Sequence, residues 1–220
     1  MLDNRKSRKV EGNMKKICKK IMCGMIALCL LAAALQYRNS QLQQNIAEKI
    51  LRFHVVANSN TKADQELKLK VRDKIGTYLQ DKLQGVDNLA ACIDIVENEK
   101  AAIENCAKEV ITQEGYDYFV KAQIANVDFP VKTYGAYTFP AGNYQALKIT
   151  IGSGNGENWW CVMYPNMCFA NSVYEVIDEH SKEELRAVLT KEEYQELMQS
   201  GNIQISFKYI DNLLEKIRKK

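Results

Sequence analysis

The sequence predicts an α+β fold, a single domain preceded by a hydrophobic leader, from the order of three kinds of segment. Helical apolar spacing runs through residues 61–113, β-rich segments fill residues 116–164, and helical spacing returns at residues 181–200. Helices that stand before and after a run of strands are typical of an α+β domain. With 220 residues, of which 46% are apolar, the chain is long enough to bury the core of one domain.

Residues 1–35 predict an export signal or a membrane anchor. Basic residues precede an uncharged run from Ile21 to Leu35. As a helix this run spans about 22 Å, less than the roughly 30 Å of a hydrocarbon core. Its alanines fit a signal cleaved after Ala34, and an uncleaved anchor extended through Tyr37 is the alternative. Both place residues 36–220 outside the cytoplasm, because the positive flank stays inside.

The excess of positive charge lies in the leader. The formal net charge is +3, but the residues after the leader hold 22 Lys and Arg against 25 Asp and Glu, a net charge of about −3. A nucleic-acid-binding protein needs a concentrated basic surface on its folded domain. The sequence therefore argues against a nucleic-acid partner.

The predicted domain covers residues 50–220 and follows a polar spacer, residues 36–49. The segment ILRFHVVA, residues 50–57, is β-rich and predicts a partly buried strand. A helix follows, with Asn60 or Thr61 as its N-cap and Asp64 in a capping-box position. Its predicted core stripe comprises Leu67, Val71, Ile75, Tyr78 and Leu79.

The next elements are predicted from caps and composition. Asp87 or Asn88 can cap a helical region over residues 89–113, with a break near residues 97–99, and Gly115 ends it. Aromatic and β-branched segments between residues 116 and 164 predict a central antiparallel meander of three or four strands. The C-terminal helices are predicted at residues 181–200, with Ser181 as N-cap and Glu184 completing a capping box, and at residues 207–220.

Polar side chains crowd the junction between the predicted strand and helix, residues 58–61, which we call the strand–helix corner. His54 lies on the strand before it, and Asp64, Lys68 and Arg72 step by four residues along the helix after it. This row is offset from the apolar stripe, so we expect it to be exposed. Such a row is most often a solvated face with weak ion pairs. The corner is therefore a catalytic site, a binding edge or a well-capped turn.

Enzymatic signatures are absent from the sequence. It contains no H-E-x-x-H, G-x-S-x-G or C-x-x-C motif, and only two histidines. We therefore expect no catalytic residue, no metal site and no cofactor. The segment GSGNGEN, residues 152–158, is glycine-rich but matches no phosphate-binding motif, and we interpret it as a flexible hairpin connection. The alternative enzyme is an envelope or cell-wall hydrolase that uses Asp64 or Asp73 with His54.

Two cysteines are spaced for a disulfide bond. Cys161 and Cys168 flank VMYPNM, and in an exported chain this spacing predicts a small disulfide loop. Closing such a loop stabilises by roughly 2.5 kcal/mol in the chain-entropy view. Cys92 and Cys106 are a second candidate pair, but on one straight helix they lie about 21 Å apart and cannot bond.

Two long segments resemble a known family. FHVVANSNTKADQELKLKVRD and VKTYGAYTFPAGNYQALKITIGSGNGENWWCVMYPNMCF are similar to the signature of the stage II sporulation protein R family, as is the short hydrophobic leader. The resemblance covers residues 50–170. It implies a non-catalytic signal of endospore-forming bacteria, made in the forespore and exported into the intermembrane space. Its implied partner is a membrane-embedded aspartic protease that processes the mother-cell pro-sigma-E factor.

The resemblance implies that the corner is a recognition and folding element. The membrane is expected as a second contact only if the leader is uncleaved. The candidate receptor-binding residues are His54, Asn58, Ser59, Asp64, Gln65, Lys68 and Arg72.

Overall fold

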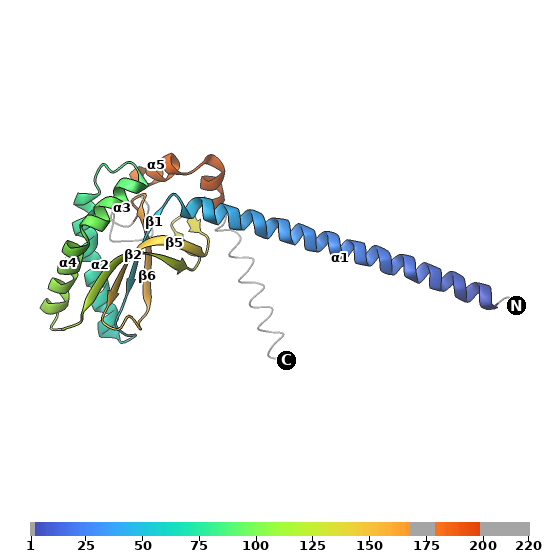
Figure 1. The fold of residues 1–220 in the computed structure, drawn as a ribbon, viewed down its shortest axis with the longest axis horizontal. Coiled ribbons are helices and arrows are strands. Elements are labelled where there is room, and N and C mark those ends of the chain that lie inside the picture. Colours follow the sequence, from blue (N-terminus) through green and yellow to red (C-terminus); the bar gives the residue numbers. More distant parts are fainter. Residues whose placement is uncertain (1–2, 168–178, 199–220) are drawn as a thin grey trace. The chain divides into compact units, whose positions relative to one another are not determined.

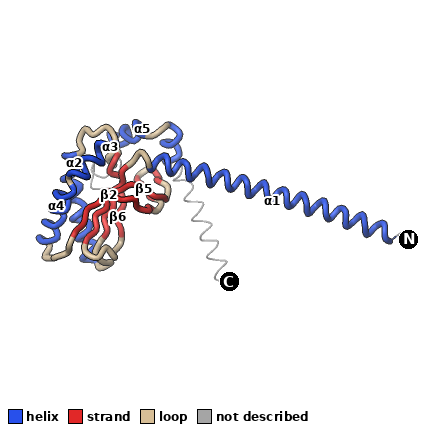
Figure 2. The backbone as a smooth tube through the Cα atoms, in the orientation of Figure 1, coloured by secondary structure: helices blue, strands red, loops and turns tan. Residues whose placement is uncertain are grey.

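The computed structural model describes residues 3–167 and 179–198. Its contacts divide the chain into two units, Met1–Leu42 and Gln43–Lys220. The second unit contains a mixed sheet and a layer of helices, which Figure 2 shows in red and blue. This arrangement confirms the predicted α+β fold.

The N-terminal unit is helical. Helix α1 spans Asp3–Ala47, and its part from Lys19 to Ala47 is long and apolar enough to cross a membrane, by length and composition alone. Among the described residues this is the one helix that meets that test, and a signal sequence meets it too. The helix is therefore compatible with either predicted role of the leader.

The folded unit begins inside the segment predicted as a spacer. Its first residue is Gln43, whose side-chain amide donates to the Asn143 carbonyl at 3.1 Å. Ile46 and Ile50 are fully buried. The last turn of α1 therefore contributes to the core of this unit.

The main sheet has four strands in the order β2-β5-β1-β6. They are β1, Leu51–Val56; β2, Val120–Phe129; β5, Gly142–Ile151; and β6, Asn158–Tyr164. Strand β1 runs parallel to β5 and antiparallel to β6, while β2 and β5 are antiparallel. Every residue of β1 is buried, so this strand forms the centre of the core (Figure 1).

The predicted meander is wrong in one respect, because β1 lies between β5 and β6. Strand β1, which was predicted to be partly buried, is buried on both of its faces. A strand of this kind is favoured at the centre of a sheet. The intervening β3, Lys132–Tyr134, and β4, Tyr137–Phe139, form a separate two-stranded hairpin.

Helices cover one face of the sheet. They are α2, Lys62–Lys82; α3, Leu89–Asn98; and α4, Lys100–Gln113. Asn88 caps α3 by accepting from the Ala91 amide at 2.8 Å, and the predicted break falls at Glu99. Gly115 ends α4 with φ 83°. The buried stripe of α2 comprises Leu67, Val71, Ile75 and Leu79.

The two faces of the sheet differ in their cover. Side chains alternate along each strand, so Phe53 and Val55 point towards the helices and Arg52 and His54 point away. We call the second side the hairpin face, because Tyr134 of β3 donates to the Trp160 carbonyl and accepts from Arg52 there. These contacts place the hairpin over Arg52 and beside Trp160.

The C-terminal helices differ from the prediction. Helix α5 spans Glu179–Val188, and residues 191–198 form a further helix. Ser181 lies inside α5, where its hydroxyl donates to the Asn166 carbonyl, so it is not the predicted N-cap. Instead Thr190 and Glu193 exchange side-chain-to-backbone hydrogen bonds at 2.8 and 3.2 Å, as a capping box. The helix predicted at residues 207–220 lies outside the described residues.

Candidate functional site

The strand–helix corner is held by the cap of α2. Thr61 has extended backbone angles, and its hydroxyl accepts from the Asp64 amide at 3.3 Å. The Ser59 hydroxyl in turn accepts from the Thr61 amide at 3.2 Å. These bonds satisfy N–H groups that the first turn of a helix leaves without partners. The predicted cap is therefore confirmed at Thr61.

Asp64 is the centre of the corner. Its carboxylate accepts from the Asn58 amide at 2.9 Å and from the Ser59 hydroxyl at 2.5 Å. Burial raises the pKa of Asp64, but hydrogen bonds from Ser59, Asn58, Tyr118 and Thr61 outweigh it and hold the pKa below its usual value. Asp64 is therefore a structural anion whose lone pairs are already used.

The loop between β5 and β6, residues 152–157, closes over this corner. The Ser153 amide donates to the Asn58 side-chain oxygen at 2.9 Å, and the Asn155 amide donates to the Asn58 carbonyl at 3.1 Å. Gly152 has φ 55°, and a side chain there would collide with Asn58. A side chain at Gly156 would collide with the Ser59 carbonyl.

The glycine-rich segment is therefore a fitted cover for the corner. It does connect two strands, as predicted, but the strands are not neighbours, so it is not a hairpin connection. Its glycines let the backbone approach Asn58 and Ser59 closely. The loop and the corner, which lie far apart in the sequence, form one site.

Lys68 joins the helix to the same loop. Its ammonium group donates to the Glu157 carbonyl at 2.9 Å and to the Gln65 side chain at 2.6 Å. Gln65 donates to the Ser59 carbonyl at 2.8 Å. Burial lowers the pKa of Lys68, and nearby Glu157 opposes this effect.

The row predicted to be exposed is mostly buried, so that prediction is wrong. Asp64 is 4% exposed, Lys68 is 5% exposed, and the Arg72 side chain is 12% exposed. The β5–β6 loop covers the first two, and the Arg72 guanidinium lies 5.0 Å from the ring centre of Trp159. Helical spacing locates the stripe under the helix but not a loop that folds over its flank.

His54 lies apart from the corner network, on the hairpin face of β1. It is 3% exposed, stacks on Trp160 at 4.0 Å, and its Nε2 lies 2.7 Å from the Asn158 side-chain oxygen. Burial is the main cause that lowers the pKa of His54 to about 4, with Lys148 and Lys68 adding to it and Asn158 opposing it. At neutral pH the ring is uncharged.

The described residues do not pair a histidine with an acid at this site. His54 lies against the Asn158 side chain, the carboxylate of Asp64 accepts from Asn58 and Ser59, and Asp73 pairs with Arg72 at 2.6 Å. No group of three or more His, Cys, Asp or Glu side chains that could hold a metal occurs in the described parts of the chain.

Arg52 is a buried charged residue that was not predicted from the sequence as part of a site. This arginine is fully buried; its Nε donates to the Cys161 carbonyl at 2.9 Å and its Nη2 donates to Tyr134 at 3.1 Å. Its guanidinium lies 4.3 Å from the ring centre of Phe129, and the rings of Tyr134, Phe139 and Tyr144 also surround it. The signal available in the sequence was a charged residue within an otherwise apolar strand.

The cysteines are divided between bonded and free. Cys161 is disulfide-bonded. Cys168 lies outside the described residues, so the pairing of these two cysteines stays a prediction. Cys92 on α3 and Cys106 on α4 are free, and burial raises the pKa of Cys92 to about 12.

The fold and the corner define a class of protein, an α+β domain that follows an apolar N-terminal helix. In this domain one polar site joins the central strand, helix α2 and the β5–β6 loop. The sequence profile of Stage II sporulation protein R matches residues 47–174. The chain is 30% identical over 172 residues to Stage II sporulation protein R of Bacillus subtilis (strain 168), which covers 74% of this chain and 77% of that protein. The chain therefore belongs to the stage II sporulation protein R family. No solved structure matches it.

Proposed function

We propose that this chain is an exported sporulation signal that activates a membrane-embedded aspartic protease, which in turn processes the mother-cell pro-sigma-E factor. Membership of the family supports a role in sporulation. The observation that carries the finer proposal is that the match spans both the corner and the loop closed over it, the two segments on which the resemblance rests.

Export is supported by the N-terminal helix. A basic stretch precedes an apolar run that is long enough, within α1, to enter a membrane. A positive flank favours retention on the cytoplasmic side and delivers the following residues to the other side. The domain then meets its protease partner from outside the cytoplasm, either released from the leader or anchored by it.

A non-catalytic role is supported by how the corner uses its polar groups. The carboxylate of Asp64 accepts two strong hydrogen bonds, and the ammonium group of Lys68 donates two. A general acid or base must exchange a proton with a substrate atom within hydrogen-bond reach. The candidate receptor-binding residues of the corner therefore act by fixing a shape that a partner recognises, and their direct contact with a receptor stays a prediction.

The proposal is tested by reconstitution. The full chain is mixed with the purified protease and its pro-sigma substrate in detergent, with each component also omitted in turn. We expect processing only when all three are present, and none with a protease whose catalytic aspartate is replaced by Asn. Processing of the substrate by this chain without the protease would instead contradict a non-catalytic role.

A further inference from the structure

The strand register gives the hairpin face row by row. Where β2, β5, β1 and β6 lie side by side, one row across the sheet is Gln123, Lys148, His54 and Trp160. The next row, towards the β5–β6 loop, is Lys121, Thr150, Val56 and Asn158. We call these two rows the open rows. The hairpin β3–β4 contacts Arg52 at the other end of the face and reaches the edge of the open rows where Tyr134 donates to the Trp160 carbonyl.

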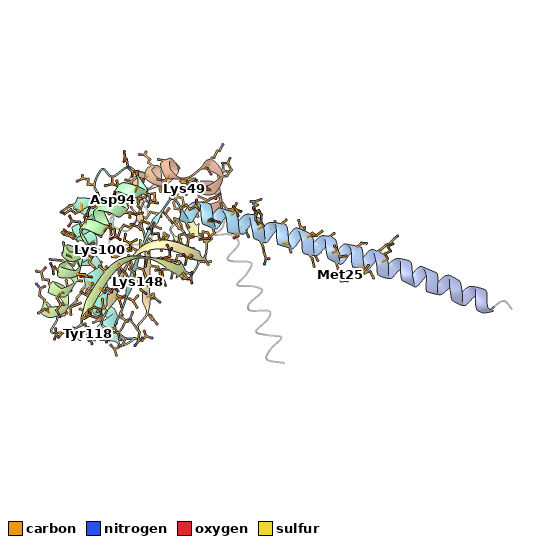
Figure 3. The ribbon with its side chains drawn as sticks, viewed as in Figure 1. Met25, Lys49, Asp94, Lys100, Tyr118 and Lys148 are labelled. Carbon is orange, nitrogen blue, oxygen red and sulfur yellow. The ribbon has the colours of Figure 1, made fainter. Side chains whose placement is uncertain are left out.

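The open rows are accessible from solvent at both edges. Lys121 and Asn158 are exposed, and Lys148 and Trp160 are half-buried. Figure 3 labels Lys148, which belongs to β5 within the sheet. The opposite face of the same strands is buried by helices, with Leu147 and Ile149 fully buried. One side of the sheet is thus closed by the protein's own helices, and part of the other is not.

The charge of this face is of one sign. At the paired strand positions it carries the basic residues Arg52, Lys121 and Lys148 and His54, but no Asp or Glu. Lys121 and Lys148 make no ion pair with the side chains that the structure describes, which are those of residues 19–167, 179 and 181–198. Lysines on the helices instead pair with acids at Glu109, Glu99 and Glu97. After the leader the chain carries more acids than bases. The hairpin face is therefore positively charged although the chain after the leader has a negative net charge.

Hydrogen bonding marks the same face independently. In the part of the chain that the structure describes, two buried side-chain atoms have no hydrogen-bond partner, and they are Arg52 Nη1 and His54 Nδ1. Both residues lie on the hairpin face of β1, and both contact the ring of Phe129, at 4.3 and 5.9 Å. Buried polar groups are nearly always satisfied in folded proteins, so each exception calls for an explanation. Of these two residues, His54 belongs to the open rows, whereas Arg52 is fully buried beneath the hairpin.

We infer that the open rows dock an acidic segment of a protein partner, with Lys121 and Lys148 facing its carboxylates and Trp160 packing against its apolar atoms. The inference rests on the proposed function for the identity of that partner, which is an extracytoplasmic segment of the membrane protease. Charge complementarity of this kind steers association and fixes the orientation of the partner.

A peptide fits these rows better than an anionic membrane surface does. Membrane-binding patches gather several lysines or arginines on a protruding surface. The open rows instead place only two lysines beside hydrogen-bonding groups, Gln123 and Asn158, and an aromatic ring. Interfaces between proteins are enriched in such aromatic anchors with a polar rim.

The test uses the full chain carrying Lys121→Glu and Lys148→Glu together. Its control is the full chain with Lys74→Glu and Lys100→Glu, which changes the net charge equally on helices α2 and α4. We expect affinity for the detergent-solubilised protease to fall about tenfold or more with the first pair and by less than about twofold with the control. Lys121→Arg with Lys148→Arg should bind like wild type. Thermal unfolding confirms that each variant is folded.

A second arm does not depend on the protease. A hexaglutamate peptide is titrated into the Trp159→Phe chain, in which Trp160 is the remaining tryptophan, at low salt. We expect a saturable change in fluorescence that the double Glu variant loses. The same titration with phosphatidylglycerol vesicles separates a peptide site from a membrane site.

The outcomes separate the two proposals. Wild-type protease binding by the folded double Glu variant overturns the docking surface and leaves the proposed function standing. If wild type neither binds nor activates the protease, the proposed function fails, and the docking surface is then supported or overturned by the peptide titration alone. Saturable binding to vesicles but not to peptide overturns it in favour of a lipid surface.

Discussion

The strand–helix corner and the hairpin face are built on the same central strand, but they treat polar groups in opposite ways. In the corner, Asn58 and Asp64 are each joined to several partners, including a loop almost a hundred residues away. On the hairpin face, Arg52 and His54 each keep a buried atom without one. A satisfied network of buried polar groups rigidifies a fold, whereas a buried polar group without a partner is costly. We propose from this difference that the first region fixes the shape of the domain and that the second contacts the partner.

The largest expected effect comes from removing the centre of the corner. Asp64→Ala leaves the half-buried donors of Asn58 and Ser59 without their acceptor, and we expect it to lower the free energy of unfolding by about 3 kcal/mol. Urea unfolding of the full chain measures it, with the exposed Glu66→Ala as a control expected within about 0.5 kcal/mol. A loss below about 1 kcal/mol for Asp64→Ala would show that the corner is not a stabilising network.

His54 on the hairpin face should make the stability of the folded chain depend on pH. The pKa of His54 is lowered to about 4 in the folded chain and is about 6.5 when unfolded, so between these values the unfolded chain binds a proton that the folded chain does not. Stability is therefore lost as the pH falls through this window, by about 2 kcal/mol from about pH 7 to about pH 5.

Unfolding by urea at the two pH values checks this prediction, with His54→Gln as the matched variant. The variant has no titrating ring, so its stability should change much less over the same interval. An equal pH dependence in the wild type and His54→Gln would contradict the assignment of the effect to this side chain.

A smaller effect is expected at the helix cap. Thr61→Ala removes the acceptor of the Asp64 amide, and we expect a loss of about 1 kcal/mol. The neighbouring Lys62→Ala, at the start of the same helix and exposed, is the control. A cap effect as large as that of Asp64→Ala would mean that the hydroxyl and not the carboxylate organises the corner.

The smallest effect on stability is expected on the open rows. Lys148→Glu replaces a half-buried side chain that makes no ion pair in the described part of the chain, so we expect a change within about 0.5 kcal/mol. Thermal unfolding of the Lys148→Glu and Lys121→Glu variants measures this change in stability. A strong destabilisation by either substitution would show that the lysine stabilises the fold, as the corner does.

The sequence predicted what depends on neighbouring residues. The cap at Thr61, the cap at Asn88 and the break at Glu99 follow from short-range hydrogen bonding and from the period of the helix. Gly115 ended its helix as expected because a positive φ suits glycine there.

Features that depend on contacts between distant parts of the chain were not predicted from the sequence. The burial of Lys68 depends on the Glu157 carbonyl, and the burial of Arg52 depends on rings from β2, β5 and the β3–β4 hairpin. The position of β1 inside the sheet depends on pairings with strands about a hundred residues later in the chain. Ser181 matched a capping pattern, but a tertiary bond to Asn166 used its hydroxyl instead. Local patterns cannot report such partners.

The most direct test of the contrast is lysine labelling of the full chain, alone and in complex with the protease, with the acetylation of each lysine followed by mass spectrometry. The account predicts that Lys121 and Lys148 lose reactivity in the complex, that Lys74 and Lys100 keep theirs, and that the buried Lys68 reacts slowly in both states. Unchanged reactivity at Lys121 and Lys148, with protection instead at Lys62 beside the corner, would contradict it.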